Sequence, residues 1–339
     1  IFVCSIPSAH GFSLALDSIA TWGKFPRFCV NTYRWGDKFF NSYDSLYVVG
    51  TGNKFNVKFK ADSWLDYYAF DFDNKTTMHM VSQPCTSMGI YLTYLAVSAG
   101  YDINVSKYFG GQEQARKRFN FSFSCSLFAA DFYYLSNDIG TRITRFGPRH
   151  KVEHLDLDFK GINNYSWGLD TYYFFNHKRY SQGAAFGFSK IQKKSAGTFY
   201  AGFSIWMQKF NFDFSGLPDY MKSSIPLAST DYHYSVKSNN YAVKLGYAYN
   251  WVFKRNFLFA VTEAPTLGLR HGYINNPDNI KNSFAMYNKL KISLVYNYKK
   301  LFAGIIGYHE SGLIYDKEHA LINMMMGVEM AVGYRFNLW

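Results

Sequence analysis

The tripeptide His309-Glu310-Ser311 is the first candidate for chemistry in this 339-residue chain. In an extended strand, His309 and Ser311 would lie on one face, about 6.5–7 Å apart along the strand. A serine hydroxyl activated by an imidazole, whose ring a carboxylate orients, is the arrangement of a nucleophilic hydrolase. Glu318 or Glu329 could orient the imidazole, and the substrate of such an enzyme in a membrane would be lipid. The alternative is that both residues are hydrogen-bonded polar groups near the end of a strand.

A second candidate is the alternating trio His154, Asp156 and Asp158. Imidazole and carboxylates are suitable metal ligands. The sequence offers no recognisable fourth ligand, however, and pairing of the carboxylates with lysines explains the trio better. We therefore expect no metal site and no cofactor.

The elements that would position these residues are long strands, and the last strand is the most regular. From Ile322 to Leu338 every second residue is apolar, whereas the intervening residues are mostly small, polar or charged and include Glu329 and Arg335. One face of the strand is therefore hydrocarbon-like. The run exceeds the usual strand of about five or six residues, and it suits a strand that crosses a bilayer in a closed barrel.

Composition supports the same fold. Aromatic residues make up 20% of the chain although its mean hydropathy is only −0.20, as expected where aromatic girdles surround a polar interior. No apolar run reaches the roughly 20 residues that a membrane-spanning helix needs. A soluble sandwich would share the period of two, but its strands would be shorter. The prediction is an all-β fold, a transmembrane antiparallel up-and-down β-barrel of about 14 strands, within a range of about 12–16.

The start of the chain differs from the rest. Residues 1–11 form an apolar run followed by Pro7 and the small residues Ser8 and Ala9, which resembles the end of a secretion signal; a frayed apolar terminus is the alternative. We expect a short N-terminal periplasmic or plug segment at residues 12–50 and the barrel at residues 51–339. The expected location is the bacterial outer membrane, with the chain as an integral protein.

The formal net charge of +12 raises the question of partners. No basic helix, zinc finger or stacking motif indicates nucleic acid. Cations at strand ends could contact outer-membrane lipid phosphates or lipopolysaccharide, or they could be solvated rim charges. A further outer-membrane or periplasmic protein is a candidate partner.

The face opposite the apolar one would line the lumen. An open pore would leave its charges solvated, whereas a closed interior would pair them, because unpaired buried charge is costly. The balanced mixture favours a largely self-paired interior with at most a narrow channel. The expected lumenal charges are Lys58, Arg118, Lys244, Arg270, Lys289, Lys291, Arg335, Asp102, Asp131, Asp156, Asp158, Asp170 and Glu329.

One block of sequence is more specific than any barrel rule demands. It begins with Phe175-Asn176 and Tyr180-Ser181, continues with Ala184-Ala185-Phe186, and ends with Gln192 and Ser195-Ala196-Gly197. The block resembles an uncharacterised family of Gram-negative outer-membrane β-barrel proteins, one of the numbered domains of unknown function, over roughly residues 40–339. Gln182-Gly183 departs from the family pattern, which has bulkier residues there. The resemblance implies an exported barrel and no activity.

Within this block, residues 176–179 and residues 192–197 are both predicted to be turns, at opposite rims of one hairpin. The functional expectation is a non-enzymatic outer-membrane protein, either a narrow channel or a structural accessory of an outer-membrane assembly. The alternative is a lipid hydrolase that uses Ser311 and His309.

Overall fold

The computed structural model describes residues 31, 42–72, 75–95, 97–109, 116–225, 232–274, 281–315 and 319–338, apart from a few side chains beside the gaps. The chain divides into two compact units, residues 1–42 and residues 43–339. The expected signal remnant lies outside the described residues. So does most of the expected segment at residues 12–50, of which only residues 31 and 42–50 are described.

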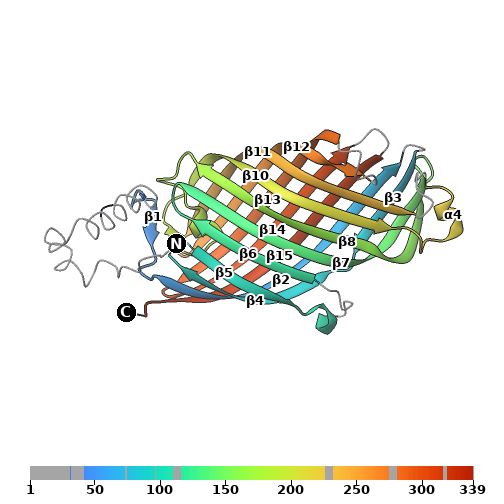
Figure 1. Ribbon diagram of the computed structural model, residues 1–339. Helices are drawn as coiled ribbons and strands as arrows, with labels where there is room; N and C mark the ends of the chain where they lie inside the picture. Colours follow the sequence, from blue (N-terminus) through green and yellow to red (C-terminus); the bar gives the residue numbers. More distant parts are fainter. Residues whose placement is uncertain are drawn as a thin grey trace. The chain divides into compact units, whose positions relative to one another are not determined.

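A single antiparallel sheet of thirteen strands dominates the second unit, and pairing of its last strand with its first closes the sheet into a ring (Figure 1). The expected barrel is therefore confirmed. A separate two-stranded sheet joins β1 to β9. The strands are β1 (Val48–Gly50), β2 (Phe55–Phe72), β3 (Thr76–Ser82), β4 (Cys85–Tyr94), β5 (Val97–Asn104), β6 (Arg116–Ser124), β7 (Phe128–Pro148), β8 (Glu153–Phe174), β9 (Lys190–Gln192), β10 (Ala196–Asp213), β11 (His233–Lys254), β12 (Phe257–Ile274), β13 (Lys281–Tyr298), β14 (Leu301–Tyr315) and β15 (His319–Phe336).

The ring has two different ends. At the turn end, where the described chain finishes, only Arg255-Asn256 separates β11 from β12 and only Lys299-Lys300 separates β13 from β14. The opposite, loop end carries the connection of residues 214–232, which contains the short helix α4 (Asp219–Lys222). Short turns at one end and longer loops at the other are usual in outer-membrane barrels, with the turns on the periplasmic side.

The circumference changes along the barrel. The strands β3 and β4 follow one another along the same edge of β2, so the thirteen strands occupy twelve positions around the ring. The pair β5–β6 lies between β4 and β7 at the turn end only, whereas β3 pairs directly with β7 at the loop end. The ring therefore has twelve strand positions at the turn end and ten at the loop end, and the larger number falls within the expected range.

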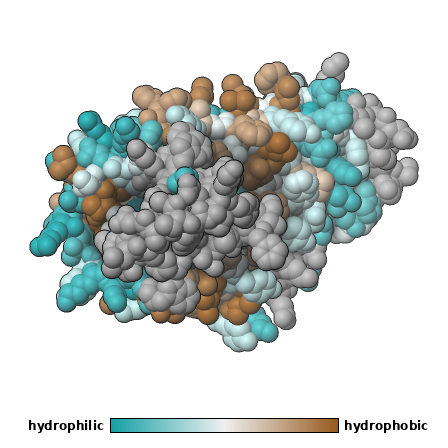
Figure 2. Space-filling model, turned by 60° about the vertical axis from the view of Figure 1, so that its left-hand side comes forward, coloured by the Kyte–Doolittle hydropathy of each residue, from teal (hydrophilic) through white to brown (hydrophobic). Residues whose placement is uncertain are grey.

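The outer wall is apolar over most of its height. On β15 the exposed residues include Met326, Val328, Met330 and Val332, and β11 shows the same alternation from Tyr241 to Trp251. Figure 2 shows patches of hydrophobic residues at the top and bottom of the view, among hydrophilic ones. An apolar wall around a polar interior, in a sheet without free edges, is the arrangement that a bilayer requires. None of the described helices is long and apolar enough to span a membrane.

Candidate functional site

The lumen at the loop end is filled by side chains. Phe70 from β2 meets Phe212 from β10 with ring centroids 4.7 Å apart, although the two strands lie far apart in the ring. Met78, Phe159 and Leu217 belong to the same buried cluster, to which β2, β3, β7, β8, β10, β11, β14, β15 and the loop with α4 contribute. This loop-end core leaves the barrel filled by hydrocarbon and aromatic rings at that end.

The turn end is filled differently, by the chain between β8 and β10. Residues 175–195 carry α3 (Gln182–Ala185) and β9, and Ala184, Ala185 and Phe188 pack against inward-facing residues of β12, β13, β14 and β15. We call residues 175–195 the lumenal plug. Residues 176–179 form a turn, as predicted, but residues 192–195 belong to the same connection and residues 196–197 begin β10, so the placement of the two segments at opposite rims of one hairpin was wrong. The Asn176 amide donates to the Gly197 carbonyl at 2.8 Å.

The side-chain amide of Gln192 stabilises the plug through both its oxygen and its nitrogen. Its Oε1 accepts from the Ser181 backbone N–H at 3.1 Å and from Asn250 Nδ2 at 3.0 Å. Its Nε2 donates to the carbonyls of Arg179, at 2.6 Å, and Lys194, at 2.9 Å. A buried amide that makes four such bonds fixes the path of the chain on both sides of α3, because each abandoned partner would be a buried unsatisfied polar group.

Phe188 anchors the far end of α3 to the barrel wall. Its ring stacks on Phe302 at 4.9 Å, and Gly304 leaves the room that this ring occupies. Its backbone has φ 55°, a strained conformation for a residue other than glycine. The buried Arg335 guanidinium compensates by donating to the Phe188 carbonyl through Nε at 3.0 Å and through Nη2 at 2.8 Å.

A chamber of about 390 Å³ lies between the plug and the loop-end core and reaches Thr93, Leu95 and Ser98 at the turn end. The plug contributes Gln182, Phe186, Gly187 and Ser189 to its lining. The remaining lining mixes hydroxyl groups, amides and charges with aromatic and aliphatic side chains. The charges divide into two networks.

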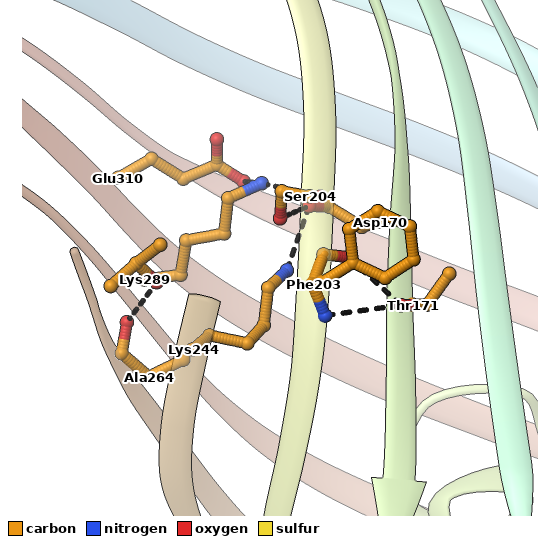
Figure 3. Close-up of polar contacts among 9 residues, drawn as sticks. Asp170, Thr171, Phe203, Ser204, Lys244, Ala264, Lys289 and Glu310 are labelled. Carbon is orange, nitrogen blue, oxygen red and sulfur yellow. Dashed lines mark hydrogen bonds and ion pairs between the residues drawn. The ribbon is translucent and has the colours of Figure 1, made fainter. Parts of the chain in front are cut away.

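The first network centres on Asp170 of β8 (Figure 3). Its Oδ1 accepts from Lys244 Nζ of β11 at 2.7 Å and from the Ser204 hydroxyl of β10, and its Oδ2 accepts from Lys289 Nζ of β13 at 2.8 Å. Lys289 also lies 3.5 Å from a carboxylate oxygen of Glu310 on β14. This Asp170 network thus joins five strands across the lumen.

The sheet itself is irregular beside Asp170. The β8–β10 ladder is interrupted at Thr171 and Phe203, where the Thr171 hydroxyl takes the place of backbone groups. It donates to the Phe203 carbonyl at 2.9 Å and accepts from the Phe203 N–H at 3.1 Å. The wall therefore remains hydrogen-bonded where Asp170 turns inward.

The second network lies on the opposite wall. Lys60 Nζ of β2 lies 3.3 Å from Asp102 of β5 and 3.6 Å from Glu329 of β15, and Lys58 Nζ lies 3.9 Å from Glu329. The Tyr91 hydroxyl donates to Asp102, and the Lys60 ammonium lies 4.6 Å from the Tyr91 ring centroid. Such mutual pairing satisfies charges that are largely removed from water.

Most of the predicted lumenal charges lie inside the barrel. Lys58, Lys289, Lys291, Asp131, Asp170 and Glu329 line the chamber. Lys244, Arg270, Arg335, Asp102 and Asp170 are buried. The side chain of Arg118 lies outside the described part of the structure.

Asp156 and Asp158 are the exceptions, since they lie on the outer surface, where both approach Arg142. The expectation that these two carboxylates line the lumen was wrong. At the loop end the interior is apolar, so Leu155 and Leu157 turn inward to the core and the carboxylates turn outward. Within the described residues, no group of three or more histidine, cysteine or acidic side chains is arranged to hold a metal ion.

His309 and Ser311 lie on the outer wall of β14. The alternate residues Tyr308 and Glu310 reach into the lumen, where Tyr308 donates to Asp62 at 2.9 Å, and the β14 ladder is regular, so His309 and Ser311 face outward. The third candidate, Glu318, lies outside the described residues. The strand thus presents the imidazole and the hydroxyl to the membrane side.

Sequence reasoning missed Lys60, Glu310 and the role of Gln192. Lys60 lies two residues after Lys58 and therefore on the same face of β2, and Glu310 is opposite Lys289 in the pairing of β13 with β14. Both positions could therefore have been recognised as lumenal. The only sign of Gln192 was its place in the block that carries the family resemblance. Its four partners come from segments whose proximity no local pattern reveals.

Comparison with known proteins decides the family. Residues 42–336 match the family described as domain of unknown function DUF4421. The chain belongs to this family. No curated protein matches the chain.

Among solved structures, the outer-membrane protease OmpT from Escherichia coli has a TM-score of 0.40 at 7% identity, covering 84% of this chain and 97% of that one. The outer-membrane protein OprG from Pseudomonas aeruginosa has a TM-score of 0.29 at 12% identity, covering 85% and 100%. The toluene transporter TodX from Pseudomonas putida has a TM-score of 0.28 at 8% identity, covering 83% and 89%. Likeness this low carries no indication of a shared activity.

The DUF4421 chain is an integral barrel of the outer membrane. This follows from its own architecture, because the described strands close into a ring, most of its wall is apolar and two networks of charges lie in the lumen.

Proposed function

We propose that this DUF4421 protein is a non-enzymatic outer-membrane barrel whose lumen is closed to solutes and which serves as a structural accessory of an outer-membrane assembly. The observation that supports it is the Asp170 network, which spans the lumen between the plug and the loop-end core. A solute could pass only if the plug moved, the ion pairs opened and the loop-end core came apart. Breaking one buried pair typically costs about 3–5 kcal/mol, so spontaneous opening would be rare.

The chamber favours a second candidate, a narrow channel. A cavity of about 390 Å³ is large enough for a small polar molecule, and Lys289 and Lys291 line it. In this case the plug would act as a gate.

Conductance in planar bilayers separates the two candidates. The accessory function predicts no steady current above that of the lipid, and a protein that co-purifies with the barrel from outer membranes. A steady current that falls in the variant Lys289→Gln/Lys291→Gln would overturn the accessory function and establish the channel. Lys237→Gln is a matched control, because Lys237 is an exposed lysine on β11 at the loop end.

A separate assay addresses the hydrolase alternative. Purified barrel in vesicles of outer-membrane lipid is expected to release no fatty acid. Release that disappears in Ser311→Ala but persists in Ser63→Ala would establish the enzyme instead. Ser63 is a suitable control because it also faces the wall, where its hydroxyl lies 3.2 Å from that of Thr86.

A further inference from the structure

A polar patch interrupts the apolar wall on β12, β13 and β14. It consists of Glu263, Asn288, His309 and Ser311, of which Asn288 and Ser311 also border the chamber, and we call it the wall patch. Glu263 is exposed, whereas its neighbours Thr262 and Ala264 are buried on the lumenal side. The β12–β13 register is continuous through Glu263, so its outward direction follows from the alternation of the strand.

The wall patch lies deep in the apolar band. Phe259 and Val261 precede Glu263 on the same face of β12, and Leu267 and Leu269 follow it. Glu263 is six residues from the first residue of β12, Phe257. At about 3.3 Å per residue and a tilt of about 45°, that distance corresponds to a height of roughly 14 Å, near the middle of a band about 25 Å tall.

Strand register brings the four side chains together. Glu263 is opposite Leu290, and Leu290 is opposite His309. Asn288 is opposite Ser311, and its Nδ2 lies 3.3 Å from Glu263 Oε1. The acid and the imidazole therefore lie on either side of Leu290, one strand away in each direction.

Two other polar sites on the wall, at Ser63 and at Thr171, have local hydrogen-bond partners, whereas Glu263 has little such support. The hydroxyls of Ser63 and Thr86 lie 3.2 Å apart, and the Thr171 hydroxyl replaces missing backbone bonds. Glu263, by contrast, makes no ion pair within the described part of the chain and accepts one hydrogen bond from an amide. A carboxylate that faces hydrocarbon destabilises a barrel unless a partner covers it.

The backbone around the wall patch permits close approach. Gly307, which precedes His309 on the same face of β14, has open space where a side chain would project. Pro265 follows Glu263 on its face and cannot donate to the ladder, which is interrupted between β11 and β12 at this level. Small side chains at such a place allow two membrane-embedded surfaces to meet closely.

We propose that the wall patch is the contact between two copies of this chain in the membrane. A twofold axis along the membrane normal near Leu290 would place Glu263 of each copy on the side of His309 of the other, with a height difference of roughly 7 Å at a tilt of about 45° that the two side chains have to bridge. The patch is self-complementary, as an isologous interface requires, because it carries an acid and a base on opposite sides of one strand. A lipid headgroup cannot cover it, since headgroups lie at the edges of the apolar band.

Crosslinking and charge reversal test the twofold contact. In vesicles of outer-membrane lipid, a Leu290→Cys variant with its native cysteines replaced by serine is expected to form a covalent dimer with a short bis-thiol reagent. The matched control Leu169→Cys, on the wall face of β8, is expected to remain monomeric. Equal crosslinking at both positions, or none at position 290, would overturn the proposal.

Charge variants then address the chemistry of the contact. Glu263→Gln is expected to weaken the dimer about tenfold or more, as a lost ion pair in a dry interface implies, while the double variant Glu263→His/His309→Glu restores it. Heat-modifiable gel mobility checks that each variant is folded. A double variant as weak as the single ones would refute the reciprocal pair. The outcome does not depend on conductance, so it can fail while the closed lumen stands.

Discussion

Replacing Asp170 by asparagine should destabilise the barrel more than any single surface charge. The Asp170 side chain is 7% exposed, the Lys244 side chain is 1% exposed, and Lys244 Nζ lies 2.7 Å from Asp170 Oδ1. Removing one partner of a buried pair typically costs about 3–5 kcal/mol, because the other charge is left uncompensated. Lys289 would keep Glu310 at 3.5 Å, so the loss arises mainly at Lys244.

Part of the loss would be offset by an aromatic ring. Lys244 Nζ lies 4.4 Å from the centroid of the Tyr172 ring, a cation–π contact worth about 1 kcal/mol. The expected net loss of unfolding free energy for Asp170→Asn is therefore about 2–4 kcal/mol. The double variant Asp170→Asn/Lys244→Met also removes the unpaired ammonium. It should recover most of the lost unfolding free energy, because an apolar side chain leaves no uncompensated charge.

Urea unfolding in lipid vesicles, followed by tryptophan fluorescence and gel mobility, measures these differences. Asp158→Asn is the control, because Asp158 is 67% exposed and lies 3.7 Å from Arg142. Asp158→Asn should change the unfolding free energy by no more than about 0.5 kcal/mol. The reasoning is refuted if Asp170→Asn costs no more than this control, or if the double variant is no more stable than Asp170→Asn alone.

Three further outcomes are expected. Gln192→Ala should lower the free energy of unfolding by at least about 2 kcal/mol and speed tryptic cleavage of the plug, because it leaves buried donors and acceptors without partners. An unchanged cleavage rate would contradict the role of Gln192. Phe212→Ala should lower stability by about 3–5 kcal/mol, and Phe203→Ala, on the lipid-facing wall, by much less; equal losses in thermal unfolding would contradict the loop-end core. A cysteine at position 158 should react quickly with a membrane-impermeant thiol reagent and one at position 329 slowly, and the reverse order would contradict their placement.

The barrel itself could be predicted from sequence because the bilayer imposes a strong pattern. The strand from Ile322 to Leu338 alternates without a break, and the structure exposes Met326 and Val328 on its wall as the alternation requires. The pattern fails where the barrel leaves the lipid. In β10 the phenylalanine and aliphatic side chains lie at odd positions from Phe199 to Met207 and at even positions from Phe210 onward, whereas Tyr200 and Trp206 already point inward at even positions. This change of parity marks the loop-end core, and recognising it would have placed Asp156 and Asp158 correctly.

The interior network was only partly predictable. Parity indicated that Asp170, Lys244 and Lys289 face the lumen, but it could not show which charges meet, because partners on distant strands depend on the curvature and shear of the ring. The plug was harder still. Its sequence reads as turns between strands, and only packing against four strands shows that residues 182–188 fold inward.

The change from twelve to ten strand positions explains why the two ends are closed in different ways. The diameter of a barrel grows roughly in proportion to its strand number, so the internal cross-section at the loop end is about 30% smaller than at the turn end. Aromatic side chains from opposite walls can meet across the narrower end, as Phe70 and Phe212 do. Side chains alone would leave a void at the wider end, and a folded segment of main chain occupies it instead. The short β5–β6 pair, by widening one end of the ring, thereby creates the space that the plug fills.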